Sequence, residues 1–175
     1  MALDHRLSKL AVGAKHGALA FVRSRVAGAA LTEAERAQAD EFEATLEAMF
    51  LMAAVDGDIA KEEIAQLAAS IEGIVDTTAH THVKDLDATL SELHAKLARD
   101  GWKARLDTLA RRLRSEESRA FAFRLAAGVA FCDDTVAHAE AAAIDAFAGA
   151  LGLSPEESQE ILTDVQATLF EASPS

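Results

Sequence analysis

The scarcity of proline is the feature that most constrains what this chain can fold into. Pro155 and Pro174 are the only two prolines in 175 residues, and proline inside a helix removes a hydrogen bond and clashes with the preceding turn. Hydrophobic residues make up 50% of the chain, and many are alanine, the best helix former. No segment alternates in the way that indicates a strand. The sequence therefore predicts an all-α protein with closely approaching helices.

Capping signals and apolar spacing predict where the helices begin and end. Thr32 and Glu35 fit a capping box, and Ser154 and Glu157 fit a second one around Pro155. Apolar residues recur at helical steps of three and four between these two points. We expect a bundle of about seven to eight helices, with segments at about 3–27, 33–54, 61–71, 82–100, 102–113, 116–131, 137–150 and 155–171 and a linker over 73–81.

Charge is distributed unevenly along the chain. The net charge of -12 disfavours general nucleic-acid binding. Residues 1–30 nevertheless carry five basic residues against Asp4 alone, which predicts a separate, basic, amphipathic N-terminal helical segment ahead of a domain over 31–175. A second basic stretch covers 96–124, and we expect it to form a solvated or salt-bridged helix face that could meet acidic loops of the other half.

Targeting signals and disulfides are not indicated. Cys132 is the only cysteine, so no intramolecular disulfide can form, which suits a reducing compartment. Lys15 and His16 interrupt the first apolar stretch before a signal peptide could build up. No run of about 18 apolar residues indicates a transmembrane helix. We expect a cytoplasmic protein, with peripheral contact to the inner membrane left open.

Two segments of the chain resemble each other, at about 40–72 and 117–152. In the first, Asp56 follows a long predicted helix and Glu63 comes seven residues later. In the second, Asp133 and Glu140 repeat that spacing after another long helix. Repeats on this scale indicate a duplicated supersecondary unit. We therefore expect two pseudo-symmetric helix-loop-helix units.

The pattern Ala-x-x-Asp-Gly-x-Ile-x-x-x-Glu at residues 53–63, with a degenerate copy at 130–140, resembles the TerB-like family associated with tellurite resistance. The resemblance implies an all-α bundle of two such units, whose acidic loop residues are associated with metal cations. Carried onto this chain, it implies Asp56, Glu63, Asp133 and Glu140 as ligands. The second copy departs from the pattern, because Asp134 stands where the family has glycine.

The residue types in these loops suit a hard divalent cation such as Ca²⁺, Mg²⁺ or Mn²⁺, which prefers several oxygen ligands. Asp58 is a natural third donor in the first loop, and Asp134 adds a carboxylate to the second. The alternative is capping, because Asp at a helix start and Glu in its first turn also stabilise a helix without any metal. Capping explains one loop well, but it explains the recurrence of the same spacing less well.

No catalytic pattern is present. The chain has no phosphate-binding glycine loop, no His-Glu-x-x-His, no Gly-x-Ser-x-Gly and no Cys-x-x-Cys. We therefore expect a protein that is not an enzyme, either a cation-binding protein of a bacterial stress-response system, as the resemblance implies, or a metal-free helical scaffold that binds protein partners. In the second case, residues 1–28 could dock on a partner or on an anionic membrane surface.

Overall fold

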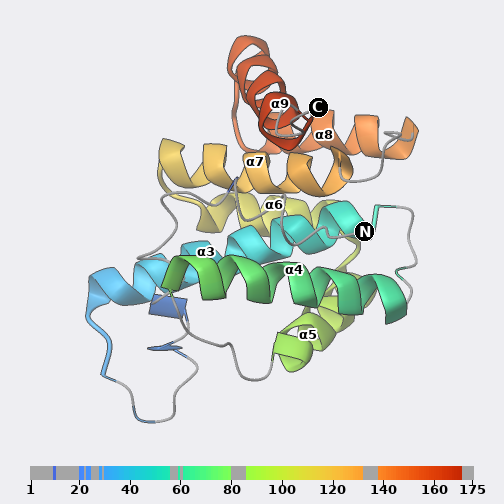
Figure 1. Cartoon of the computed structure of the whole chain (residues 1–175). Helices are drawn as coiled ribbons and strands as arrows, with labels where there is room; N and C mark the ends of the chain where they lie inside the picture. Colours follow the sequence, from blue (N-terminus) through green and yellow to red (C-terminus); the bar gives the residue numbers. More distant parts are fainter. Residues whose placement is uncertain are drawn as a thin grey trace.

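The computed structural model describes a helical bundle, in which every regular element of the described residues is a helix (Figure 1). The described residues are Leu10, Ala20, Phe21, Arg23, Ser24, Gly28, Ile59 and the ranges 30–55, 61–79, 86–131 and 138–170. The helices are α3 (Glu33–Ala53), α4 (Lys61–Ala79), α5 (Leu86–Asp100), α6 (Trp102–Arg112), α7 (Glu116–Phe131), α8 (His138–Ala150) and α9 (Pro155–Phe170). The predicted all-α class is confirmed.

The predicted capping boxes form at both ends of this series. The Thr32 hydroxyl accepts from the Glu35 amide at 3.1 Å, and the Glu35 carboxylate accepts from the Thr32 amide at 2.9 Å. Ser154 and Glu157 make the same reciprocal pair, at 3.1 and 2.8 Å, at the start of α9. These bonds satisfy amides that have no partner inside their own helix.

Helix α3 lies at the centre of the bundle. It packs most extensively against α7 and also contacts α6, α4 and α5. Every residue from 44 to 52 is buried, as expected for a helix surrounded on all sides rather than amphipathic. In Figure 1, α4 and α5 lie on one side of α3, and α8 and α9 lie beyond α7 on the other.

The prediction of a short helix over 61–71 followed by a linker over 73–81 was wrong for the residues up to 79. Helix α4 continues through Gly73 and ends at Ala79. Glycine inside a helix costs only about 1 kcal/mol relative to alanine, and α4 packs against both α5 and α3. These tertiary contacts outweigh the weak local preference.

Three of the described residues of the N-terminal segment, Leu10, Ala20 and Phe21, belong to the core. Leu10 and Phe21 are fully buried, and the Phe21 ring lies 5.4 Å from the ring of Phe42 on α3. Arg23 pairs with Glu35 at 2.5 Å. Apart from Leu10, Ala20, Phe21, Arg23 and Ser24, the helix predicted over 3–27 lies outside the described residues.

Candidate functional site

The two described members of the predicted metal set begin helices. Glu63 is an exposed residue in the first turn of α4, and Glu140 is a half-buried residue in the first turn of α8. The other four predicted ligands lie outside the described residues: Asp56, Asp58, Asp133 and Asp134. Among the residues that the structure describes, no group of three or more His, Cys, Asp or Glu could hold a metal ion.

The helices that flank the two acidic turns share one end of the bundle. Helices α3 and α7 pack side by side, and Figure 1 shows their C-terminal ends on the same side of the molecule. The first turns of α4 and α8 also lie on that side (Figure 1). Each of these two helix starts carries a carboxylate, Glu63 or Glu140, the ligand type that hard cations prefer. The pseudo-symmetry of the two units remains a prediction.

The last turn of α3 is tied to other helices by Trp102. The indole Nε1 of Trp102, at the start of α6, donates to the carbonyl oxygen of Leu51 at 2.8 Å. In a regular helix the Val55 amide would donate to the Leu51 carbonyl. Here it donates to the Met52 carbonyl oxygen instead, so the Leu51 carbonyl can accept from the indole. The Trp102 ring also stands edge-on to Phe147 of α8, with 5.7 Å between centroids. One side chain therefore connects the end of α3 with α8.

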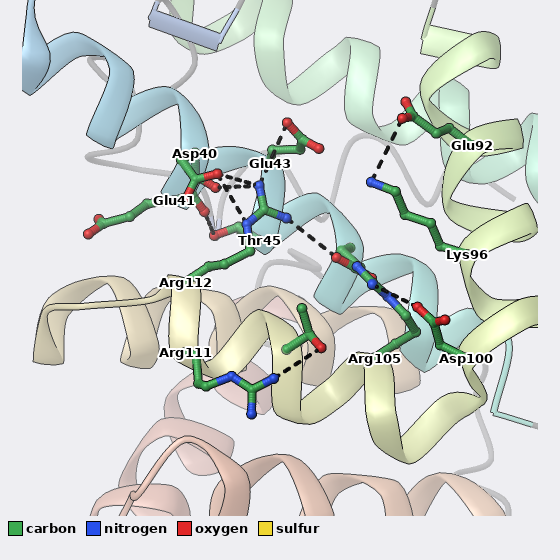
Figure 2. Close-up of polar contacts among 12 residues, drawn as sticks. Asp40, Glu41, Glu43, Thr45, Glu92, Lys96, Asp100, Arg105, Arg111 and Arg112 are labelled. Carbon is green, nitrogen blue, oxygen red and sulfur yellow. Dashed lines mark hydrogen bonds and ion pairs between the residues drawn. The ribbon is translucent and has the colours of Figure 1, made fainter.

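A buried ionic network between α3 and α6 is the most developed polar feature of the described residues (Figure 2). The Arg105 Nε donates to Glu47 Oε1 at 2.6 Å, and Arg105 Nη1 donates to Asp100 Oδ2 at 3.1 Å. The Glu47 and Arg105 side chains are only 1% and 8% exposed. The turn that brings Asp100 to Arg105 depends on Gly101, whose φ of 87° favours glycine.

The second arm of this network is centred on Arg112. Its Nη2 and Nε donate to Asp40 Oδ1 at 2.6 and 3.1 Å, and Nη2 also lies 3.7 Å from Glu43. Its Nη1 lies 3.6 Å from Glu47 Oε2, an oxygen that accepts no hydrogen bond within the described structure. Glu47 therefore lies between two guanidinium groups that belong to the same helix.

The ion pairs of this network shift the pKa values of Arg105, Arg112 and Asp100. The hydrogen bond to Glu47 raises the pKa of Arg105, ahead of the opposing effect of burial. Burial lowers the pKa of Arg112, but the bond to Asp40 and the neighbouring acids outweigh it, so the pKa is raised. Hydrogen bonds from Arg99 and then Arg105 lower the pKa of Asp100 to about 2. All three groups are charged at neutral pH.

Sequence reasoning did not identify this network. We expected the basic stretch 96–124 to be solvated or salt-bridged and to meet acidic loops. It is salt-bridged, but Arg105 and Arg112 pair with a helix, α3. The available signal was spacing: three acids of α3 lie at steps of three and four, and the two arginines are seven residues apart on α6. Both spacings place side chains on one helix face.

Histidine and cysteine side chains add no metal-ligand group within the described part of the chain. His94 is exposed, and its ring stands edge-on to Phe50 at 6.4 Å. Cys132, His80 and His82 lie outside the described residues. Within the described part of the chain, no helix is long and apolar enough to span a bilayer.

This arrangement of helices, with acids in the first turns of α4 and α8, defines an all-helical domain. A family model described as tellurite resistance protein TerB matches residues 42–163. The chain therefore belongs to the TerB family, which confirms the resemblance predicted from the repeated motif. Comparisons with curated proteins and with solved structures give no match.

Proposed function

We propose that this TerB-family chain is a non-catalytic protein that binds a divalent cation, Ca²⁺, Mg²⁺ or Mn²⁺, in a bacterial stress-response system of the tellurite-resistance type. The observation that carries the proposal is the duplicated spacing of acids. Asp56 and Glu63 flank the turn between α3 and α4, and Asp133 and Glu140 flank the turn between α7 and α8. Asp58 and Asp134 complete the two proposed ligand sets.

The chemistry of these residues supports the proposal. Carboxylates are the ligands that hard divalent cations prefer, and waters or backbone carbonyls commonly complete the shell. Glu63 and Glu140 occupy corresponding positions, each in the first turn of the helix that follows its loop. The small number of carboxylate ligands predicts weak binding, with a dissociation constant on the order of 10⁻⁵ to 10⁻³ M.

Calorimetric titration of Ca²⁺, Mg²⁺ and Mn²⁺ into the chelator-treated full chain tests the proposal. We expect heat of binding from the wild type, and loss of one site each in Asp56→Asn/Glu63→Gln and Asp133→Asn/Glu140→Gln. The pair Glu72→Gln/Asp107→Asn removes two exposed carboxylates elsewhere and should bind normally. Absence of heat from the wild type would exclude cation binding, and unchanged binding in both site variants would exclude these ligands.

Trp102 supplies a second measurement in the same titration. It is the only tryptophan, the chain has no tyrosine, and its indole is bonded to the last turn of α3. A cation bound by Asp56 and Glu63 should change the fluorescence emission of Trp102, with the same midpoint as the calorimetric titration. Emission that changes equally in Asp56→Asn/Glu63→Gln would assign the signal to another site.

A metal-free protein-interaction module is the second candidate function. The specific observation in its favour is an acidic groove beside the first turns of α7. Docking through the N-terminal segment gains less support, because Leu10, Ala20 and Phe21 are buried in the chain's own core. A membrane or partner contact of residues 1–28 would have to use other side chains.

A further inference from the structure

A groove of about 350 Å³ lies where the first turns of α7 meet the α8–α9 connection and α9. Its apolar lining comes from Ala120 of α7, Leu151 and Leu153 of the connection, and Ile161 of α9. The volume is at the lower end of the range for ligand sites in proteins, and it suits one or two long side chains. None of the proposed cation ligands lines this groove.

The remaining lining of the groove is strongly acidic. Four glutamates contribute to it and all are exposed: Glu116, Glu117, Glu157 and Glu160. Arg119 is the one cation in the lining, and its Nε is already engaged by the Leu113 carbonyl at 2.8 Å. Within the described structure, Glu116, Glu117 and Glu160 form no ion pair. Arg119 offsets only one of the four glutamates, so the groove presents a net negative charge beside an apolar surface.

Helix capping explains part of this charge. Glu116, Glu117 and Glu157 lie in first turns, where acids complement the helix dipole. Glu157 also accepts from the Ser154 amide, and this bond lowers its pKa. Glu160 lies beyond the first turn of α9, so the dipole does not explain its position. Capping also gives no reason for an apolar hollow between the acids.

We propose that this groove binds a basic segment of a partner protein, through a lysine or arginine side chain. Such side chains combine an apolar stem with a charged head. The stem would lie against Leu153 and Ile161, and the head would lie among Glu116, Glu117 and Glu160. A bare metal ion would gain nothing from the apolar wall, and a nucleic acid would be repelled by the lining. Charge complementarity of this kind contributes to specificity and to the association rate.

Fluorescence anisotropy with a labelled peptide of alternating lysine and leucine tests the proposal on the full chain, with chelator present so that cation binding does not contribute. A peptide of alternating glutamate and leucine serves as the reversed-charge probe. We expect binding of the basic peptide only, and at least about tenfold weaker binding by Glu116→Gln/Glu117→Gln/Glu160→Gln, because each exposed pair contributes modestly. Glu157 is left intact to preserve the cap.

The matched control is Glu72→Gln/Asp107→Asn/Asp145→Asn, which changes the net charge equally at exposed positions away from the groove. Equal weakening in both triple variants would mean that only net charge matters, and it would overturn the proposal. Ala120→Leu fills the groove without changing charge, and it should weaken binding by a similar factor while the circular dichroism spectrum stays unchanged. Full affinity in Ala120→Leu would also overturn the proposal.

Discussion

Carboxylates have opposite surroundings at two interfaces of the bundle. Between α3 and α6, Asp40 and Glu47 accept short hydrogen bonds from arginines, and Glu47 is almost completely buried. At the groove between α7 and α9, Glu117 and Glu160 are exposed and form no ion pair with the described residues. The first interface uses its acids to hold two helices together. Along the second, Arg124 of α7 pairs with Asp164 of α9, but the glutamates of the groove stay available to solvent.

The difference shows that the number of acidic residues at an interface does not reveal their role. Acids that are paired with arginines hold helices together, whereas unpaired, exposed acids are available to a ligand. Both interfaces are rich in glutamate, but only α6 offers arginines at a spacing that matches the acids of α3. A buried pair is not necessarily stabilising compared with apolar residues, yet losing one partner leaves a charge without compensation. The acids of the two regions should therefore respond very differently to substitution.

The largest effect is expected for Glu47→Ala. The substitution removes the buried carboxylate that Arg105 and Arg112 share. Asp100 and Asp40 remain as partners of the two arginines, so the free energy of unfolding should fall by about 3 kcal/mol, the low end of the cost of breaking a buried ion pair. Urea denaturation followed by circular dichroism measures this change. Glu41→Ala is the control, because Glu41 lies on the same helix and forms no ion pair with the described residues, and it should cost about 1 kcal/mol or less. Equal costs for the two variants would contradict the structural role of Glu47.

Much of the fold was predictable because local signals were strong. The capping box at Thr32, the break between helices at residue 101 and the helix over 116–131 all follow from short-range rules, and the structure has them where expected. Helix α4 was predicted too short because Gly73 is a local signal that tertiary packing overrides. Local rules locate helix ends well where side chains cap them, and less well where packing decides.

The candidate site was less predictable from the sequence. The repeated Asp and Glu spacing identified the family, and the family match covers both copies. The ionic network was missed because an arginine on a helix looks the same in sequence whether it faces water or a neighbouring helix. Only the packing of α3 against α6 distinguishes Arg105 and Arg112 from the other basic residues of that stretch.

A smaller, pH-dependent effect is expected at the edge of the network. Arg99 and Arg105 lower the pKa of Asp100 from an ordinary value of 3.8 to about 2. A lowered pKa in the folded state stabilises the protein above about pH 4, and this stabilisation is lost as the pH falls through about 2. The difference in unfolding free energy between wild type and Asp100→Asn should therefore be larger at pH 6 than at pH 2.

Urea denaturation of both proteins at the two pH values measures this difference, and Asp107→Asn, an exposed acid of α6, provides the control. Arg105 stays charged over the whole range, so protonation of Asp100 alone changes the pair. A gap between wild type and Asp100→Asn that stays constant with pH would contradict the ion pairing of Asp100 in solution.

The smallest effect is expected where the acids are free of ion pairs. In Glu116→Gln/Glu117→Gln/Glu160→Gln, the loss of favourable first-turn charges is offset by relief of repulsion among the carboxylates of the groove. The unfolding free energy should change by no more than about 0.5 kcal/mol, as for ordinary surface substitutions. Urea denaturation at low and high salt measures it, and any change should shrink with salt. A loss comparable to that of Glu47→Ala would mean that these acids also hold the bundle together, and the contrast between the two interfaces would disappear.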